Sequence, residues 1–261
     1  MRRPSETSRM NFALGKEILV ASPGIFSHRV GGRIVYVKKS RRRKNPLGFW
    51  IQKALHRLTA NPLLSPPPGP GRDSAGFEAD RLKRLAALGV PVPRVLHRGD
   101  GYFVMSDTGI GLNLIFERNR EKAERLLSVV LSELRRLHDL GQAHGGSQAR
   151  NITILKGKVH FIDFEDDIGP DVLADFQLRD LFLFLHSLEC LGADPDLSRL
   201  CRLYDPEDGA RERLFRALAG LRLAKMMASR LFSPLAMRDI RGLIRLIDKA
   251  GRLSGAGASS G

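Results

Sequence analysis

The spacing of hydrophobic residues changes along the chain, and the change predicts strands first and helices afterwards. Apolar and polar residues alternate on both sides of Gly31-Gly32, a dipeptide typical of a hairpin turn. Residues 77–88 instead carry apolar side chains at helical spacing, and Gly89 with the prolines after it predicts the end of that helix. Strands are expected at residues 26–30, 33–39, 95–97 and 102–106, with a further short one at 17–21.

The second part of the chain reads as mainly helical. Long amphipathic patterns predict helices at residues 120–139 and 175–191, and two or three more within 210–252. Between them, residues 144–167 read as a polar loop, a strand, a two-residue turn, a second strand and a group of acids. We therefore predict the α+β class with two lobes. The expected divisions are residues 1–105, 106–253 and a flexible tail at 254–261.

Residues 40–75 read as an insertion in the first lobe. The segment opens with a basic run, continues with an amphipathic pattern that contains Trp50, and closes in a stretch rich in proline and glycine. A basic amphipathic helix can lie on an anionic membrane surface. The alternative, which one tryptophan does little to exclude, is that this helix packs on the body of the protein.

The net charge of the chain limits the class of possible binding partners but does not identify one. A net charge of +15 and a pI of about 10.6 favour an anionic partner. Nucleic acid is disfavoured, because one Trp and three Tyr provide no basic stripe interleaved with stacking aromatic residues. The two cysteines are expected to be buried thiols. No signal peptide or membrane span is apparent, so a cytoplasmic protein, peripheral on the inner membrane at most, is expected.

Several polar residues stand at the ends of the predicted strands. Lys38 and Lys39 end one strand, so that one of them can point inward beside Tyr36, although two solvated lysines would also fit the local sequence. Asn151 ends the polar loop and Asp163 ends the second strand of the central pair. An amide and a carboxylate brought together in this way could hold Mg²⁺, which leaves most of its ligand positions to water and phosphate.

Taken in order, these signals resemble the protein-kinase-like fold. The stretches that carry the resemblance are VYVKK, GVPVPRVL, H-x(6)-N and FIDFEDD, and the resemblance covers roughly residues 17–190. The chain is most similar to the divergent bacterial lipopolysaccharide-core sugar kinases. It is more distantly similar to the aminoglycoside and RIO-type phosphotransferases.

The resemblance implies an ATP- and Mg²⁺-dependent phosphotransferase. Lys38 would bind the α- and β-phosphates and pair with Glu78, and Asn151 and Asp163 would ligate magnesium. Residues 105–108 would be the hinge along the adenine, with Met105, Ser106 and Asp107 as the contacting residues. The acceptor would be a small molecule or a lipid-linked sugar, because few residues separate Asp163 from the next helix. The resemblance further implies that Asp180 binds the catalytic-loop backbone and that His144 is an internal brace.

One position departs from the family pattern. The loop should carry Asp two residues after His144, where the carboxylate orients the acceptor hydroxyl, but the residue is Gly146. Three outcomes stay open: a slow enzyme, a nucleotide-binding pseudokinase that acts as a regulatory scaffold, or an enzyme whose base comes from elsewhere. Asp166 and Asp167 are candidates for a displaced base or a further metal ligand, against the alternative that they are solvated loop acids. We also find no G-x-G-x-x-G motif.

Overall fold

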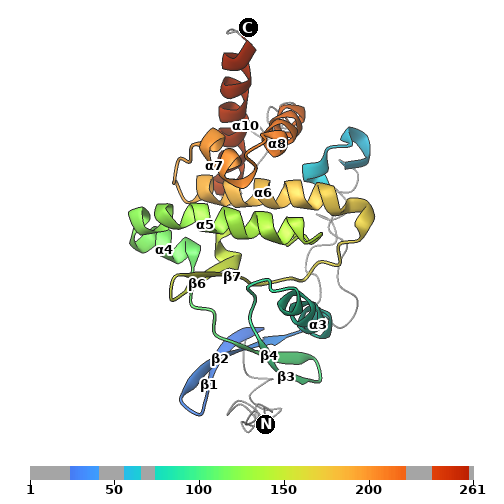
Figure 1. Cartoon of the computed structure of the whole chain (residues 1–261), viewed down its shortest axis with the longest axis vertical. Coiled ribbons are helices and arrows are strands. Elements are labelled where there is room, and N and C mark those ends of the chain that lie inside the picture. Colours follow the sequence, from blue (N-terminus) through green and yellow to red (C-terminus); the bar gives the residue numbers. More distant parts are fainter. Residues whose placement is uncertain (1–23, 41–55, 66–73, 222–236, 259–261) are drawn as a thin grey trace.

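Two groups of secondary structure lie at opposite ends of the molecule (Figure 1). The computed structural model describes residues 24–40, 56–65, 74–221 and 237–258. Four strands and one helix form the smaller group, and the larger group is mainly helical. The predicted α+β fold with a small strand-rich lobe and a helical lobe is thereby confirmed.

The small lobe is built on one antiparallel sheet in the order β1-β2-β4-β3. Gly31 and Gly32 both have positive φ angles, 53° and 75°, as a tight hairpin turn between β1 and β2 requires. The predicted hairpin is therefore confirmed, and so is the second pair of strands. The strands are β1 Ile25–Val30, β2 Arg33–Lys39, β3 Val95–Gly99 and β4 Tyr102–Ser106.

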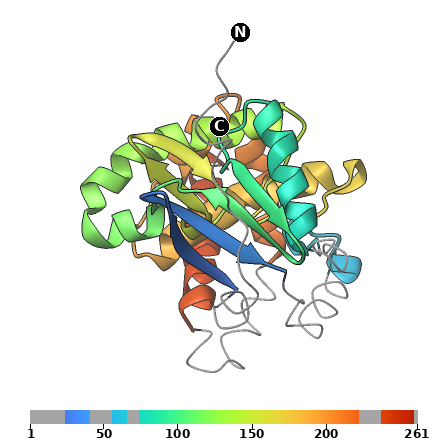
Figure 2. The same ribbon diagram turned by 90° about the horizontal axis from the view of Figure 1, so that it is seen from below.

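Strand β4 joins this sheet to the rest of the protein through the alternation of its side chains. Tyr102 and Val104 pack with Val35 and Val37 of β2 in a small cluster, whereas Phe103 and Met105 belong to the main core. Helix α3, Ser74–Ala87, contributes to the same main core and lies beside the strands (Figure 2). The sheet thus has one face turned toward α3 and the helical lobe.

The helical lobe is organised around α5 and α6, which lie side by side (Figure 1). Helix α5 begins after Asn119, whose side chain accepts a hydrogen bond of 2.8 Å from the N–H of Lys122 and caps the first turn. Helix α10 packs mainly against α6 and α8. The helices are α4 Leu112–Arg118, α5 Arg120–Asp139, α6 Leu173–Cys190, α7 Leu197–Tyr204, α8 Gly209–Gly220 and α10 Met237–Ala258.

A second, three-stranded sheet lies between the two groups and carries the loops of the candidate site (Figure 1). Strands β6 and β7 are joined by Lys156-Gly157, and both residues have positive φ, as the predicted two-residue turn needs. The edge strand β5 follows β4 closely along the chain. The strands are β5 Ile110–Gly111, β6 Ile152–Leu155 and β7 Lys158–Phe161. Three-residue 3₁₀ turns are at Pro62–Leu64, Ala149–Asn151 and Pro170–Val172.

The structure corrects several sequence predictions. The stretch after Ser106, expected to be a plain connector, contains β5 and leads into α4, and α7 was not expected. The expected tail at 254–261 begins inside α10, which continues to Ala258. The predicted strand at 17–21 and most of the basic insertion at 40–75 lie outside the described residues, although residues 56–59 are helical. None of the described helices is long and apolar enough to cross a bilayer.

Candidate active site

Lys38 points into the protein because of its register on β2. Val35 and Val37 face the small cluster, so Tyr36 and Lys38 share the opposite face, which is turned toward α3 and the main core. Lys38 is accordingly only 8% exposed. A lysine ammonium is rarely buried to this extent unless anions surround it.

Three carboxylates surround the ammonium of Lys38. Its Nζ lies 2.6 Å from Oε2 of Glu78 on α3 and 2.8 Å from Oε1 of Glu165, and it donates a short hydrogen bond to Oδ1 of Asp163. Glu78 is buried, whereas the side chains of Asp163 and Glu165 are 40% and 44% exposed. The structure therefore brings Lys38, Glu78 and Asp163 to one point, as the sequence predicted, and adds Glu165.

The pKa values of these groups follow from burial and from the mutual charges. Burial raises the pKa of Glu78 to about 7, because desolvation outweighs the attraction of Lys38 and nearby Asp163 adds to the rise. For Asp163 the balance is reversed. Burial raises its pKa, but the charge and hydrogen bond of Lys38 outweigh that effect, so the pKa of Asp163 lies below its ordinary value. Burial lowers the pKa of Lys38, but the three carboxylates more than compensate, so the lysine stays charged.

Asn151 and Asp163 lie on adjacent segments of the backbone. The N–H of Ile162 donates to the carbonyl oxygen of Asn151 over 3.0 Å, and Asp163 is the next residue along the chain. The amide nitrogen of Asn151 donates to the carbonyl oxygen of Gly146 at 2.8 Å, which leaves its amide oxygen as the acceptor. Asp163 has a φ of 73°, an uncommon conformation for a residue other than glycine, and such conformations gather at functional sites.

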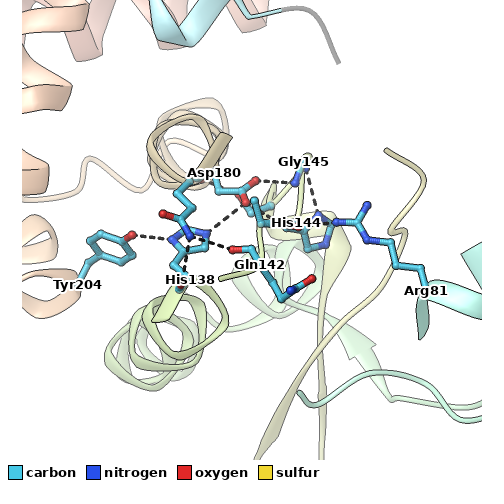
Figure 3. A network of polar contacts seen from close by, with 11 residues as sticks. Arg81, His138, Gln142, His144, Gly145, Asp180 and Tyr204 are labelled. Atoms are coloured by element: carbon cyan, nitrogen blue, oxygen red, sulfur yellow. Dashed lines mark hydrogen bonds and ion pairs between the residues drawn. The ribbon is translucent and has the colours of Figure 1, made fainter. Parts of the chain in front are cut away.

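The loop from His144 to Ser147 is held by Asp180 of α6, and Figure 3 shows Asp180 beside His144 and Gly145. The Asp180 carboxylate is fully buried and accepts the backbone N–H groups of His144 at 2.6 Å and Gly145 at 3.0 Å. The hydroxyl of Ser147 donates to the backbone carbonyl of Asp180 over 2.5 Å. This confirms the prediction that Asp180 binds the backbone of this loop and explains an acid in so apolar a helix.

Two further residues extend this network away from the loop. Nε2 of His138 lies 3.3 Å from the carboxylate of Asp180, and its Nδ1 lies 2.6 Å from the hydroxyl of Tyr204 on α7 (Figure 3). Burial raises the pKa of Asp180, but the hydrogen bond and charge of His138 outweigh it, so the pKa is lowered overall. The ionised carboxylate accepts only, so Nε2 of His138 donates to it.

The contacts of His144 are those of a buried residue that supports the loop. His144 is 1% exposed, stacks on Phe164 at 4.4 Å between ring centroids, and lies with Nε2 2.9 Å from the carbonyl oxygen of Ile162. Its Nδ1 lies 3.1 Å from the backbone N–H of Gly146 and must accept that proton, so both ring nitrogens fit the neutral imidazole. Burial lowers the pKa of His144, against the opposing effect of the acids Asp180 and Asp163.

Arg81 connects α3 to both loops of the site. It stands three residues after Glu78 and therefore on the same face of the helix. Its Nη1 donates to the carbonyl oxygen of Asp166 and its Nη2 to that of Ala143 at 2.6 Å, and its guanidinium lies over the ring of Phe164. Burial lowers the pKa of Arg81, which is 6% exposed. The helix that positions Glu78 is thus fixed to the loops that carry the acids.

The expected hinge lies where β4 leaves the small lobe. Met105 is buried, and the backbone N–H of Ser106 donates to the carbonyl of Arg94 at 2.9 Å. The side chain of Asp107 accepts the N–H of Gly109 at 2.8 Å and closes the turn into β5. Contact of Met105, Ser106 and Asp107 with adenine stays a prediction.

Gly146 leaves the loop without a carboxylate at the position where the family pattern has one. Asp166 lies close to the neighbouring glycine, since a Cβ added to Gly145 would be 2.9 Å from its Oδ2. Asp167 is exposed. Among the described residues, Asp166 is therefore the better placed of the two candidates for a displaced base.

Glu165 and Arg81 are the residues of this site that the sequence analysis missed. Glu165 stands two residues after Asp163, and side chains two apart lie on the same side of an extended segment, which was the available signal. For Arg81 the signal was the helical spacing from Glu78. Apart from this spacing, the sequence gives no indication that Arg81 is buried, because arginines on a helix are usually exposed to solvent.

The fold and this arrangement of Lys, Glu and Asp are consistent with a kinase-like fold, and comparison with known proteins supports that class. The RIO domain family, which is part of the protein-kinase-like superfamily, matches residues 72–172. The matched range contains Glu78, Asn151 and Asp163, whereas Lys38 and Asp180 lie outside it.

The chain is also similar to a Haemophilus influenzae protein named only as an uncharacterized protein. The two are 28% identical over 167 residues, which is 63% of this chain. The alignment spans 62% of the length of that curated relative. The name of that relative gives no activity.

Proposed function

We propose that the protein is an ATP- and Mg²⁺-dependent phosphotransferase of the kinase-like type. The observation that carries the proposal is the buried Lys38–Glu78 ion pair, which meets Asp163 although the three residues are far apart in the sequence. A buried ammonium with fixed orientation is suited to bind phosphate oxygens, and kinase-like domains use such a lysine in this way. The match to the RIO domain family supports the same conclusion.

Each residue has a role that follows from its chemistry. Lys38 would contact phosphate oxygens of the nucleotide, and Glu78 would hold the lysine in place. Asn151 and Asp163 would be the metal ligands, and residues 105–108 would lie along the adenine. Asp180 and His144 would keep the loop rigid without contacting the nucleotide. Catalysis of this kind rests on positioning and on charge, so rigid supports matter.

The residues present fit a magnesium ion. They offer carboxylate and amide oxygens, the ligands that Mg²⁺ prefers. Oε1 of Glu78 is also buried without a hydrogen-bond partner in the described structure, so the site has unused acceptor capacity. When bound, Mg²⁺ neutralises charge on the phosphate oxygens during transfer.

For the acceptor we propose a small molecule or a lipid-linked sugar of the bacterial envelope. Helix α6 begins at Leu173, soon after Asp163, which leaves a short connection where peptide-directed kinases carry a long substrate platform. The basic insertion at residues 40–57 supports recruitment to the anionic inner membrane face, by charge alone.

The second candidate is a pseudokinase that binds nucleotide and serves as a regulatory scaffold. Gly146 is the observation that favours it, because a general base typically contributes about 10²–10⁴-fold to the rate. A labelled product formed from ATP and envelope extract would exclude this candidate. ATP binding without any labelled product would favour it.

The test of nucleotide binding is calorimetry with ATP, in magnesium and in a chelator, on the wild type and on Lys38→Met. Loss of charged hydrogen bonds worth about 1.5–3 kcal/mol should weaken binding roughly 10- to 150-fold. Lys39→Met is the matched control, because it removes the same charge one residue away on the other face of β2. Equal affinities of the two variants, or no ATP binding by the wild type, would reject the proposal.

A further inference from the structure

Glu165 gives this site a third carboxylate beside Glu78 and Asp163. Each of the three residues has one carboxylate oxygen that lies within 4.8 Å of such an oxygen of each of the other two. Glu165 and Asp163 come from the loop after β7, whereas Glu78 comes from α3, so two separate parts of the fold converge. Such a convergence of oxygen atoms has the dimensions of a cation site.

The charges of the cluster do not balance. When Glu78 is ionised, the three carboxylates contribute −3 and Lys38 contributes +1, a formal charge of −2 in a partly buried place. Because burial raises the pKa of Glu78 to about 7, this charge is reached above that pH. A divalent cation would bring the sum to zero. Uncompensated charge away from water is unfavourable, so the cluster has a strong tendency to take up such an ion.

One oxygen atom of the cluster is unsatisfied. Oε2 of Glu78 binds Lys38, but Oε1 is buried without a hydrogen-bond partner in the described part of the chain, and the whole residue is 1% exposed. A carboxylate oxygen in such a place normally has a donor or a metal ion beside it. Asp163 and Glu165 are partly exposed, so an ion can reach the cluster from their side.

We propose that Glu78, Asp163 and Glu165 form a divalent-cation site that fills without nucleotide, with Glu165 as its distinctive ligand. Carboxylate oxygens select Mg²⁺ or Mn²⁺ over softer metals. The assignment rests on the proposed function, because it concerns the same site and adds Glu165 to the metal ligands expected there. This cation site differs from the metal site of the proposed function because cation binding requires neither ATP nor Asn151.

Lys38 and the cation share the same three carboxylates and therefore compete. The ammonium already uses one oxygen of each acid. A cation that binds these carboxylates lies close to a like charge, which weakens its binding. Removal of the lysine charge should consequently strengthen cation binding, the opposite of its expected effect on ATP.

The experiment is a titration of the nucleotide-free protein with Mn²⁺ alone, in which electron paramagnetic resonance counts the free ion. We expect one site per chain in the wild type, displaced by excess Mg²⁺. Glu165→Gln should weaken it by at least about tenfold, since even residues behind metal ligands contribute 10- to 100-fold. Lys38→Met should bind Mn²⁺ more tightly than the wild type.

Asp171→Asn is the matched control, because it removes one negative charge six residues further on, from an exposed side chain that is no candidate ligand. It should bind Mn²⁺ like the wild type. Absence of nucleotide-free binding, or an equal loss in Glu165→Gln and Asp171→Asn, would overturn the inference. Circular dichroism of each variant excludes unfolding as the cause. Since ATP is absent throughout, failure here is separate from failure of the calorimetric test with ATP.

Discussion

Replacement of Gly146 by Asp tests whether the loop lacks only its carboxylate. The position can accept a side chain: an added Cβ would lie 3.6 Å from Nδ2 of Asn151 and 4.0 Å from Nδ1 of His144, both ordinary van der Waals distances. The adjacent glycine is different, because Gly145 has a φ of 92° and its Cβ would meet Asp166 at 2.9 Å. A side chain should therefore be tolerated at Gly146 and should destabilise the protein at Gly145.

The magnitudes follow from these contacts. Gly146→Ala should change the free energy of unfolding by less than about 1 kcal/mol, since it also restricts the unfolded chain. Gly145→Ala should cost about 1–3 kcal/mol, because a residue with a side chain is forced into a left-handed conformation against Asp166. If a missing base is what limits turnover, Gly146→Asp should raise the rate about 10²–10⁴-fold, which is about 3–5 kcal/mol of barrier.

The assay measures phosphate released from ATP, with water standing in for the acceptor. Gly146→Asn is the matched control, because it has the same size and hydrogen-bonding reach but no basic carboxylate. Urea unfolding and ATP affinity, measured in parallel, show that both variants are folded and bind nucleotide. Equal turnover by the Asp and Asn variants would refute the reasoning, and the base would then have to be sought elsewhere, at Asp166 first.

Three other consequences can be measured directly. Burial raises the pKa of the Cys201 thiol to about 12, so iodoacetamide should label partly exposed Cys190 in the native protein and Cys201 only after unfolding, as mass spectrometry of the peptides would show. The folded pKa of His144 lies below its ordinary value of 6.5, so the unfolded chain takes up the proton first. Stability should therefore decline as pH falls below about 6.5, and urea unfolding of His144→Asn should show a smaller decline. Glu189 is buried and accepts from Lys249 at 2.5 Å, so Glu189→Gln should lower the free energy of unfolding by about 1.5–3 kcal/mol, whereas an unchanged urea midpoint would show that the pair is dispensable.

Periodicity was sufficient for the long elements and failed for the short ones. The helix expected at residues 120–139 has the same bounds in the structure, since its apolar face repeats over several turns. Strand β5 is only two residues long and exists because it pairs with β6, a partner that is remote in the sequence. Helix α4 follows it for two turns, too few for a clear pattern.

The residues of the candidate site fall into two groups as well: those that the sequence pattern indicates and those that only the folded structure reveals. Lys38, Glu78 and Asp163 could be proposed together because each lies near the end or the beginning of a predicted element whose order in the chain is informative. Glu165 has no such marker, since acids in a loop are commonly solvated, and only the approach of β2 in the folded chain shows that this one meets a buried lysine. Arg81 was missed because burial of an arginine depends on tertiary contacts with two loops.

The position of Asp180 matters for anyone who divides this chain into fragments. The range matched by the RIO domain family ends at residue 172, before α6 begins. A fragment trimmed to that range would lose the acid that anchors the His144 loop, the tyrosine behind it, and Lys38 on the other side. Recombinant work should therefore keep β1 through α7 in one piece, because a boundary chosen from similarity alone would cut through the site.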